Sequence, residues 1–525
     1  MKRQVKAGII IDNYPPTSWE KQILQSIRDA QHIELSFIIY LNNKKREVPD
    51  IGPGSEKIIK GSVTSQGMAN DSTLTSIQGH TPDWILSLSK TRLNGGILTL
   101  PAWGVWTFRH LAERIPFSGD FLNRSGSTSV FLDSLEADGK VRPLMEGCIS
   151  VNLHSYHRHM KKVEEITRGW ATMVSEKWRY GLMEERHPLE IATSQSAVAD
   201  KGRIFHTEMI WKAKRMKRKL FGYEYWNVGQ AKQSLESILQ GKGLEVEWFK
   251  QDRDLYYADP FLYHDGDKNK IIMEEVDYRS VKGFITEWSI VDDEISSEER
   301  ATIHNGTHLS YPYIIRDKGE LYCVPENSER GEVTLYKYEE KGWEQVQTIL
   351  KNFSAVDSTI FNHEGRWWLF CTRGAGLNRD NEELHIFYAD QLIGPWLPHK
   401  GNPVKVDVRS SRPAGAPFSH KGTLYRPAQD CSVTYGGAVV VNRIEKLSPF
   451  YFKEMSVSRI EPEKSGLYPD GVHTISVTDG MIVVDGKRTE YHVKHLLKKL
   501  YYYRPVPLEK VLTEPLTEMK KYQVE

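Results

Sequence analysis

The alternation of apolar and polar positions in the C-terminal half of the chain repeats about every fifty residues. In each copy a short strand-like segment carries a polar residue, and a Gly-containing turn and an aromatic-rich segment follow it. The five copies begin at Ala258, Ser310, Val356, Ser411 and Gly471. Steps of 46 to 61 residues between their polar positions suit one four-stranded propeller blade, which buries its faces only against neighbouring blades. The pattern therefore predicts an all-β, five-bladed propeller.

The innermost strands of a propeller converge on one axis, so one polar residue per blade can meet its counterparts there. Asp259, Glu326 and Asp357 are candidates for such a cluster, although 98 positions separate the first from the last. Aspartate is depleted in strand interiors, which favours a functional reason for its presence. The alternative interpretation is that Asp and Pro only mark turns in each repeat.

The N-terminal third has a different pattern, in which short apolar runs alternate with helical spacing. Val5 to Ile11 and Ile33 to Tyr40 have the composition of buried strands, and Ser18 to Ala30 between them has helical periodicity. Two more strands are expected over Asp83 to Leu88 and Gly96 to Leu100. This order predicts an α/β, Rossmann-like domain over residues 1–148 with a mainly parallel sheet, whose ligands lie beyond the carboxyl ends of the strands.

Two segments of this domain, residues 100–110 and 135–141, resemble the formyltransferase fold of methionyl-tRNA and sugar N-formyltransferases. Those enzymes use an Asn-x-His pair and a later aspartate while formyl passes from formyl-tetrahydrofolate to an amine. The resemblance implies that Asp138 corresponds to the aspartate.

The other two formyltransferase positions do not match. This chain has Thr107 and Arg109 in place of Asn and His, and His110 comes one position late. Arginine stays protonated near neutral pH and cannot act as a general base. A retained fold with lost or altered chemistry is therefore the main interpretation, and a working formyltransferase the alternative.

Composition limits the remaining possibilities. A chain of 525 residues with 26% charged and 39% apolar residues is an ordinary globular protein of two or three domains. Its net charge of +1 gives no general attraction to nucleic acid, and none is expected as a partner. The four cysteines lie far apart without a C-x-x-C pair, which predicts neither disulfides nor a metal site and favours a reducing, cytoplasmic location. No apolar run has the length of a signal peptide or a membrane span.

Two basic segments stand out from this neutral background. Residues 211–220 carry six positive charges in ten positions, and residues 494–504 mix bases with apolar and aromatic side chains. Such segments bind phosphate-rich surfaces or anionic lipid headgroups, or form an exposed linker face. If both share one face, the protein is expected to contact the inner face of the membrane peripherally.

These features set the predicted domain bounds. A helical and basic linker covers residues 149–225, the propeller residues 226–490, and a C-terminal tail residues 491–525. Within the linker, Val151 to Met183 is expected to form one long helix with solvated histidines at His154, His157 and His159.

Several short motifs in the propeller region carry a second resemblance. They are Tyr257 to Phe261, His308 to Pro312, Val324 to Glu326, Asp357 to Phe361, Arg366 to Phe370, Ser411 to Gly415, Arg426 to Asp430 and Gly471 to Thr474. Through them the region resembles the propeller domain at the N-terminus of plant glucosamine inositolphosphorylceramide transferases, which also occurs in bacterial proteins fused to a formyltransferase-like domain. More distantly, the blades resemble those of family 43 glycoside hydrolases, which use an Asp base, a second Asp that tunes pKa and a Glu acid.

The resemblance implies roles for the candidate carboxylates. Making or cleaving a glycosidic bond needs one protonated carboxyl group and one ionised carboxylate. Asp259 corresponds to the base, Glu326 is the best acid and Asp357 the best electrostatic partner, while Tyr311 stands where the hydrolases have their second aspartate. Further polar groups expected to bind substrate are Glu275, Arg373, Arg412, Gln429, Asp430 and His473. The arginines favour a sugar phosphate or nucleotide sugar, because a guanidinium fork matches phosphate oxygens.

Three functions are compatible with this sequence. The first is a carbohydrate-active enzyme of cell-surface glycan or glycolipid biosynthesis, with glycosyl transfer or hydrolysis at the propeller. The second is a sugar N-formyltransferase whose propeller binds the glycan. The third is a carbohydrate-binding accessory protein without catalytic activity. The expected partners are a sugar, a sugar phosphate or a glycolipid.

Overall fold

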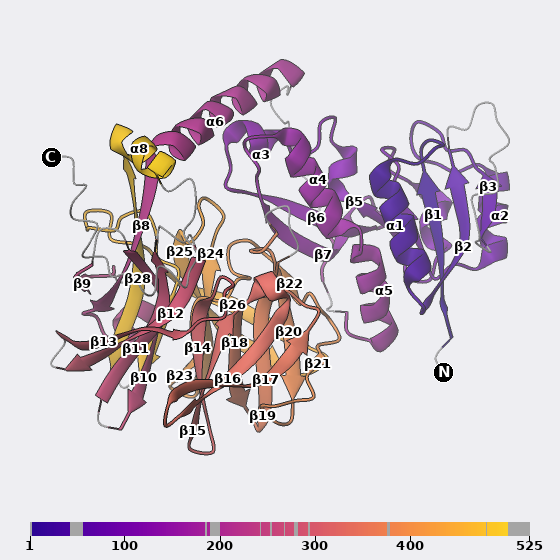
Figure 1. Cartoon of the computed structure of the whole chain (residues 1–525). Helices are drawn as coiled ribbons and strands as arrows, with labels where there is room; N and C mark the ends of the chain where they lie inside the picture. The colour runs from indigo at the N-terminus through magenta and orange to yellow at the C-terminus, as the bar shows by residue number, and fades with distance from the viewer. Residues whose placement is uncertain are drawn as a thin grey trace. The chain divides into compact units, whose positions relative to one another are not determined.

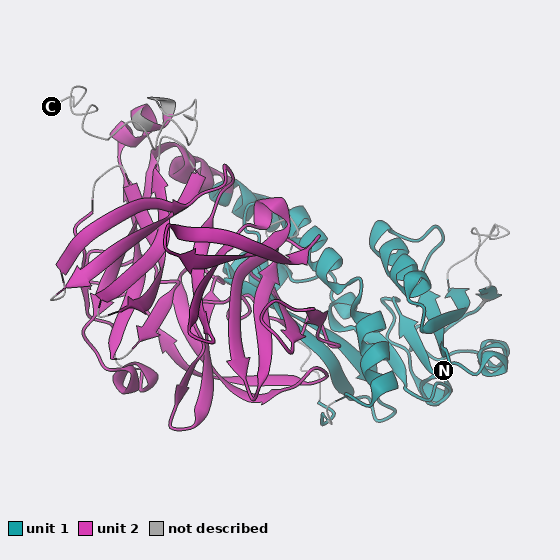
Figure 2. Cartoon of the chain, turned by 60° about the horizontal axis from the view of Figure 1, so that its bottom comes forward, with its two compact units in different colours: residues 1–211 teal, residues 212–525 magenta. Residues whose placement is uncertain are grey.

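The computed structural model describes residues 3–41, 56–183, 186–189, 200–241, 243–251, 255–266, 268–277, 282–291, 294–374, 379–478 and 480–501. The chain divides into two compact units, residues 1–211 and 212–525 (Figure 2). The expected linker, residues 149–225, therefore contributes to both units. The first unit is an α/β structure and the second contains the propeller.

Unit 1 is built on one sheet with strand order β3-β2-β1-β4-β5-β6-β7 (Figure 1). Its strands are β1 (Val5–Ile11), β2 (Ile33–Tyr40), β3 (Lys57–Lys60), β4 (Trp84–Ser87), β5 (Val105–Phe108), β6 (Ser127–Leu135) and β7 (Val141–Ser150). The pairings from β3 to β5 are parallel, and β6 and β7 add antiparallel strands. The isoleucine-rich centre of β1 is buried throughout, as expected for a parallel strand covered on both faces.

Helices connect and follow these strands. They are α1 (Ser18–Asp29), α2 (Asp71–His80), α3 (Ser118–Asn123), α4 (Tyr156–Thr167) and α5 (Trp170–Tyr180), with 3-10 turns η1 (Gly95–Thr99) and η2 (Arg109–Ala112). The start of α1 has a capping box in which Thr17 and Glu20 satisfy each other's backbone N–H groups. A further helix, α6 (Lys201–Phe221), runs across the boundary into unit 2.

Three expectations for this region are wrong. Gly96 to Leu100 is not a strand but lies largely in the 3-10 turn η1, which starts after Asn94 caps the N–H of Gly95, and Ile97 and Leu98 are buried from that turn instead. The long helix expected over Val151 to Met183 is two helices, because it is interrupted at Gly169, a poor helix former. His159 is fully buried rather than solvated.

Unit 2 contains the five predicted blades, each a separate sheet of four main strands. Blade 1 is β10 (Leu255–Asp265), β11 (Lys268–Asp277), β12 (Lys282–Val291) and β13 (Glu294–Ile303); blade 2 is β14 (Ser310–Asp317), β15 (Glu320–Glu326), β16 (Glu332–Glu339) and β17 (Gly342–Lys351). Blade 3 is β18 (Ala355–His363), β19 (Arg366–Arg373), β20 (Glu383–Ala389) and β21 (Leu397–Pro398), with the short β22 (Lys405–Val406) alongside β20. Blade 4 is β23 (Phe418–His420), β24 (Thr423–Asp430), β25 (Ala438–Leu447) and β26 (Phe452–Ile460).

Blade 5 closes the ring by joining the two ends of the propeller segment. Its inner strands β27 (Ile475–Thr478) and β28 (Met481–Tyr491) pair with β8 (Gly222–Ala231) and β9 (Val246–Trp248), which precede blade 1 in the chain. Figure 1 shows this as a yellow β28 beside a magenta β8, and their antiparallel register runs from Gly222 opposite Tyr491 to Gln230 opposite Val483. The remaining elements are α7 (Leu235–Leu239), η3 (Ser328–Arg330) and α8 (Val493–Tyr501).

Candidate functional site

The innermost strands of blades 1, 2 and 3 are interrupted at equivalent points. Each strand shifts register next to its partner, and the residue at the shift has a left-handed backbone: Asp259 (φ 52°), Tyr311 (φ 44°) and Asp357 (φ 52°). A left-handed backbone at a residue other than glycine is strained and persists only where the surroundings enforce it. The first three copies of the sequence repeat thus coincide with a bulge in the inner strands of blades 1, 2 and 3, which re-aims a side chain.

Asp357 is held by side chains from blade 4 and the segment before it. Its carboxylate accepts two hydrogen bonds from Arg412, from Nε at 2.6 Å and Nη2 at 3.2 Å, and a third from Gln429 Nε2 at 2.8 Å. Glu326, from blade 2, accepts the backbone N–H of Asp357 at 3.0 Å, and its Oε2 lies 4.0 Å from Arg412 Nη2. Glu326, Asp357, Arg412 and Gln429 are therefore brought together from three parts of the ring.

Asp259 lies among groups from blades 2 and 5. Thr474 donates its hydroxyl to Asp259 Oδ1 at 2.6 Å, and the backbone N–H of Tyr311 donates to Oδ2 at 3.3 Å. His473 Nε2 lies 3.8 Å from Oδ1. The carboxylate is only 6% exposed, so its remaining interactions take place in a medium of low polarity.

Asp485 organises the blade 5 side of this cluster. Its carboxylate accepts the backbone N–H groups of Asp259 at 3.1 Å, His473 at 2.8 Å and Thr474 at 3.0 Å, and it also contacts the Nδ1 atom of His473. It is fully buried. Asp485 was not among the predicted residues, because a lone Asp in the long strand β28 gives no recognisable motif.

A second residue that sequence reasoning missed is Glu274, on β11 of blade 1. Its Oε1 lies 3.3 Å from Nε2 of His308 and accepts no hydrogen bond from any described residue. His308 Nδ1 accepts the backbone N–H of Gly283, which places the imidazole proton on Nε2, facing Glu274. The side chain of His308 is 41% exposed, so the pair connects a buried carboxyl group with solvent.

The electrostatics of these carboxyl groups follow from burial and from each other. Burial raises the pKa of Asp259 to about 6, helped by Asp357 and Asp485 and opposed by His473. Burial likewise raises the pKa of Asp357 to about 7, although Arg412 lowers it. The pKa of Glu274 lies well above its usual range, because it is buried and faces the carboxylates of Asp259, Glu326 and Asp357. These surroundings favour the protonated form of Glu274, whereas a pKa of about 6 leaves Asp259 largely ionised at neutral pH.

The cluster reaches the surface beside an aromatic side chain. Tyr435 is 41% exposed, its hydroxyl accepts from Arg412 Nη2 at 3.3 Å, and its ring meets His473 edge-on at 5.4 Å. Behind it, the indole of Trp226 stacks on the His473 ring at 4.2 Å. An exposed ring over buried polar groups is a surface on which a sugar can stack.

The structure separates some of the predicted binding residues from this cluster. Glu275 points away from Glu274, as neighbouring strand residues must, and its carboxylate is bound by Arg300 and Thr286. Asp430 likewise faces away from Gln429 and pairs with Arg459. The structure therefore does not bring these two residues into the cluster, because adjacent residues of a strand face opposite sides.

The structure buries Tyr311 inside the cluster and leaves Arg373 exposed at the surface. Tyr311 is fully buried, and its hydroxyl bonds Thr359 at 2.9 Å and the N–H of Gly415 at 2.7 Å, so it ties blades together inside the cluster. Arg373 is exposed at the end of β19, with its guanidinium 5.2 Å from the ring centroid of Phe353. The remaining predicted residue, His473, lies within the cluster as described above.

The N-terminal candidates do not form a comparable site. His110 is buried against Trp19, Phe108 and Phe117, and burial lowers the pKa of this imidazole to about 4. Arg109 is held by two hydrogen bonds of 2.8 Å to the buried Asp133.

The other two N-terminal candidates are Thr107, on β5, and Asp138, in the turn between β6 and β7. Thr107 pairs with Asp133 across β5 and β6, whereas Asp138 lies exposed in the turn beyond β6, where its carboxylate accepts the N–H of Lys140 at 3.0 Å. Asp138 is therefore at the end of a hairpin and His110 in an aromatic core, so no proton-transfer group is assembled from them.

Three ligand atoms within the described residues could surround a cation. Atoms of Asp259, His473 and Asp485 lie within 4.8 Å of one another. However, the Asp485 oxygens already accept three backbone N–H groups, and His473 Nδ1 is in contact with one of them. These contacts satisfy the carboxylate without a metal, and they fit a histidine–carboxylate pair better than a coordination shell.

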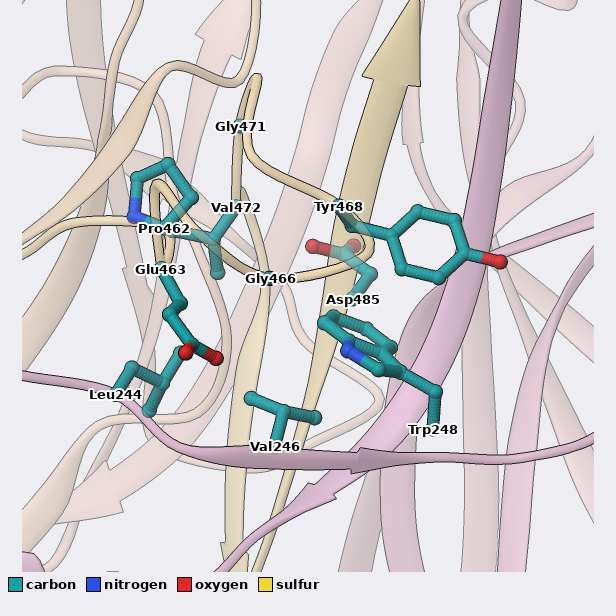
Figure 3. A pocket seen from close by; sticks show the side chains of 10 residues that line it. All are labelled: Leu244, Val246, Trp248, Pro462, Glu463, Gly466, Tyr468, Gly471, Val472 and Asp485. Atoms are coloured by element: carbon teal, nitrogen blue, oxygen red, sulfur yellow. The ribbon is translucent and has the colours of Figure 1, made fainter.

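Two cavities lie near or beyond this region. Figure 3 shows a void in blade 5 between Trp248, Tyr468 and Asp485, with a volume of about 10 Å³, which suits a single water molecule rather than a sugar. A groove of about 660 Å³ is lined by His363, Thr423 and Lys446, among others, at the strand ends opposite to Asp357. Neither cavity is lined by Tyr435 or His308.

The fold and the buried cluster together define a five-bladed propeller with a carboxylate-rich axis. Residues 251–471 match the family described as glucosamine inositolphosphorylceramide transferase 1, N-terminal. This match covers less than half of the chain and lies within the propeller.

Curated relatives carry the same name. The chain is 34% identical to glucosamine inositolphosphorylceramide transferase 1 of Oryza sativa subsp. japonica over 218 residues, which is 40% of this chain and 29% of the relative. It is 35% identical to the Arabidopsis thaliana protein of that name over 208 residues, 38% of this chain and 27% of the relative. The chain thus spans less than a third of the length of these relatives.

Solved structures with some similarity include two glycoside hydrolases. An exo-beta-1,3-galactanase from Clostridium thermocellum aligns with a TM-score of 0.33 and 12% identity, over 46% of this chain and 56% of that one. A Bacillus subtilis arabinanase aligns with a TM-score of 0.32 and 12% identity, over 44% of this chain and 93% of that one.

Proposed function

We propose that the propeller acts on a glycosidic bond, as a glycosyl-transferring or hydrolysing enzyme of glycan or glycolipid assembly. The observation that carries this proposal is the meeting of Asp259, Glu274, Glu326 and Asp357, where burial and neighbouring carboxylates raise the pKa values of Asp259, Glu274 and Asp357. The sequence match to transferases named for a glycolipid product supports a sugar-containing substrate.

The geometry suggests how the carboxyl groups divide the work. Asp259, with a pKa near 6, is ionised at neutral pH and suits the base that activates an incoming hydroxyl group or water. Glu274, whose pKa lies well above its usual range, suits the acid that donates to the leaving oxygen, and His308 faces it through Nε2 and can orient it. Glu326, the acid expected from sequence, stays an alternative for that role.

Asp357 suits a supporting role because its oxygens are already occupied by Arg412 and Gln429. It can hold Arg412 in place and raise the pKa values of the neighbouring carboxyl groups, which is the electrostatic role expected for it.

The contacts of Arg412 and Arg373 indicate which of these two arginines can bind a phosphate group of the substrate. Arg412 uses its guanidinium fork on Asp357, so it has little left for a phosphate. The exposed Arg373 is the better contact for the phosphate of a sugar phosphate or nucleotide sugar, and the exposed ring of Tyr435 is a surface for the sugar. Both a nucleotide sugar and a glycolipid headgroup present these chemical groups.

The proposal is tested by incubating the full chain with a panel of nucleotide sugars, sugar phosphates and chromogenic glycosides and measuring product by mass spectrometry. Asp259→Asn is expected to abolish turnover of any active substrate, while Asp390→Asn, the same change at an exposed side chain, leaves it unchanged. Retained turnover in Asp259→Asn contradicts the assignment. Calorimetric binding of the same sugars without turnover supports instead a carbohydrate-binding accessory protein.

Formyl transfer is the weaker alternative. It requires a histidine and an aspartate that share a substrate, whereas His110 is buried among aromatic rings and Asp138 lies in an exposed turn. Binding of formyl-tetrahydrofolate to the full chain, measured by calorimetry, would revive this function.

A further inference from the structure

Helix α6 exposes an apolar stripe along most of its length. Phe205, Met209 and Met216 are 62%, 49% and 61% exposed. With Lys212 they occupy positions i, i+4, i+7 and i+11, which lie on one face of a helix. Large apolar side chains aligned in this way on an exposed helix indicate a surface that binds a protein or a membrane.

Basic residues flank this stripe. The 21 residues of α6 include eight lysines and arginines and a single acidic residue, Glu208. Arg215 and Lys219 are exposed beside the stripe, and the exposed Lys212 lies within it. The helix therefore carries positive charge together with exposed apolar side chains whose burial against a partner is favourable.

Helix α8 extends the same chemistry beside the C-terminal end of α6 (Figure 1). Lys499 donates to the carbonyl of Lys219 at 2.8 Å, and a ring nitrogen of His495 lies 3.0 Å from the carbonyl of Phe221, which fixes the two helix ends together within unit 2. Beyond these contacts Val493 and Leu497 are each 65% exposed, and Lys494 is exposed between them. Residues 502–504 of the second basic segment lie outside the described residues.

We propose that α6, with α8, is a docking surface for an anionic lipid membrane. Exposed apolar residues between basic ones match a bilayer interface, where lysines meet headgroup phosphates and the apolar stripe enters the acyl boundary. A nucleic acid would use the charges but not the apolar stripe. Within the described residues no helix is long and apolar enough to cross a membrane.

This surface would bring the propeller to a lipid-linked substrate, and it extends the proposed function without depending on it. The two can fail separately, because vesicle binding is measured without any substrate, and turnover of a soluble sugar does not need the helices.

The test is co-sedimentation of the full chain with vesicles of phosphatidylcholine alone or mixed with phosphatidylglycerol. Binding is expected only to the anionic vesicles and to weaken at high salt, because screening shortens the range of charge interactions. Each basic residue near such a surface contributes about fivefold to partitioning, so replacing Lys212, Arg215 and Lys219 by Gln is expected to weaken binding about 100-fold.

Two further variants make the result specific. Replacing Lys318, Lys341 and Lys421 by Gln removes the same charge from exposed propeller turns and is expected to leave binding unchanged. Replacing Phe205, Met209 and Met216 by Ser is expected to weaken binding with no change in charge. The proposal is overturned by equal binding to neutral vesicles, by no binding at low salt, by equal losses in both triple-Gln variants, or by duplex RNA binding more tightly than the vesicles and displacing them.

Discussion

His308 presents Nε2 to Glu274 Oε1 at 3.3 Å, while its Nδ1 accepts a backbone N–H of Gly283. This contact joins a buried carboxyl group, whose pKa lies well above its usual range, to an imidazole that is partly exposed, and burial lowers the pKa of His308 so that it is neutral at pH 7. Because Nδ1 already accepts a backbone N–H and cannot take up a proton, His308 positions the Glu274 carboxyl group through Nε2.

The first prediction concerns the neighbouring glutamates of β11. Glu274→Gln is expected to lower kcat at least 100-fold, because the amide cannot donate a proton to a leaving group. Little stability is expected to be lost, because the amide has the same shape as the carboxyl group and burial favours the uncharged form of Glu274. Steady-state kinetics with the most active substrate measure this, and thermal melting checks the fold.

Glu275→Gln is the matched control for that variant, one residue along the same strand. It breaks the buried contact with Arg300, so it is expected to lower the melting temperature while the folded fraction keeps its kcat. If Glu275→Gln loses kcat and Glu274→Gln does not, the two assignments are reversed.

The second prediction is a pH dependence of stability. The pKa values of Asp259 and Asp357 are raised in the folded state, to about 6 and about 7, above the ordinary value of 3.8. Protonation therefore favours folding: the contribution is complete below about pH 4 and is lost as pH rises through the folded values. The wild type is expected to lose more stability between pH 5 and pH 8 than Asp259→Asn, which cannot ionise there.

Denaturant unfolding at a series of pH values measures this difference. A wild type whose stability relative to Asp259→Asn rises over that range would show that Asp259 is ionised without cost in the folded protein. The pH dependence of the activity is expected to be opposite to that of the stability. As pH rises through about 6, kcat/KM is expected to increase, because Asp259 loses its proton and becomes able to act as a base.

Much of this architecture could be predicted from the repeat, because the repeat has a physical cause. Asp259, Tyr311 and Asp357 lie at the bulges of the inner strands of blades 1, 2 and 3, so their spacing in the chain is the spacing of those blades. The sequence pointed to Glu275, whereas the structure brings Glu274 into the cluster, because two adjacent glutamates give no sign of which one faces the axis.

Other parts of the site leave no local pattern in the chain. Asp485 acts through backbone N–H groups of residues that are 226 and 12 positions away, and such contacts depend on ring closure by β8 and β28. In unit 1 the run Gly96 to Leu100 has strand composition, but the capped turn after Asn94 makes it a 3-10 helix. Short apolar runs of this kind do not distinguish the two structures.

The third prediction concerns Arg412, which links blades 3 and 4 through Asp357. Arg412→Lys keeps the charge but loses the fork that makes two hydrogen bonds to one carboxylate, and Arg412→Met removes the charge from a buried partner. The lysine variant is expected to lose about 1–2 kcal/mol of unfolding free energy and the methionine variant about 3–5 kcal/mol. Denaturant titration distinguishes them, and equal losses would show that only the charge matters.

A fourth prediction concerns the ion pair that shapes blade 4. Glu454 accepts from Arg426 Nε at 2.8 Å and from Lys405 at 2.8 Å, and these partners outweigh burial and lower the pKa of Glu454 to about 2. Because the folded pKa is depressed, this contribution is present above about pH 4.5 and is lost as pH falls toward 2. Glu454→Gln is expected to cost about 3–5 kcal/mol at pH 7 and to cost less at pH 3. A cost that is the same at both pH values would contradict the ionised pair.

The last prediction concerns Asp485, whose carboxylate accepts three backbone N–H groups and contacts His473. In Asp485→Asn one side-chain oxygen remains to accept hydrogen bonds, and the new amide NH₂ faces backbone N–H groups that have lost their acceptor. The variant is therefore expected to lose about 2–4 kcal/mol of unfolding free energy at pH 6. Burial lowers the pKa of His473, but Asp485 and Asp259 outweigh it and raise that pKa above 6.5. The stabilisation by the charged imidazole is complete below pH 6.5 and is lost as pH rises through the folded value, so the cost of the variant is expected to shrink at higher pH. NMR titration of the His473 ring protons measures the same coupling directly: an unchanged His473 pKa in Asp485→Asn would show that Asp485 positions the backbone but does not hold the charge of the imidazole.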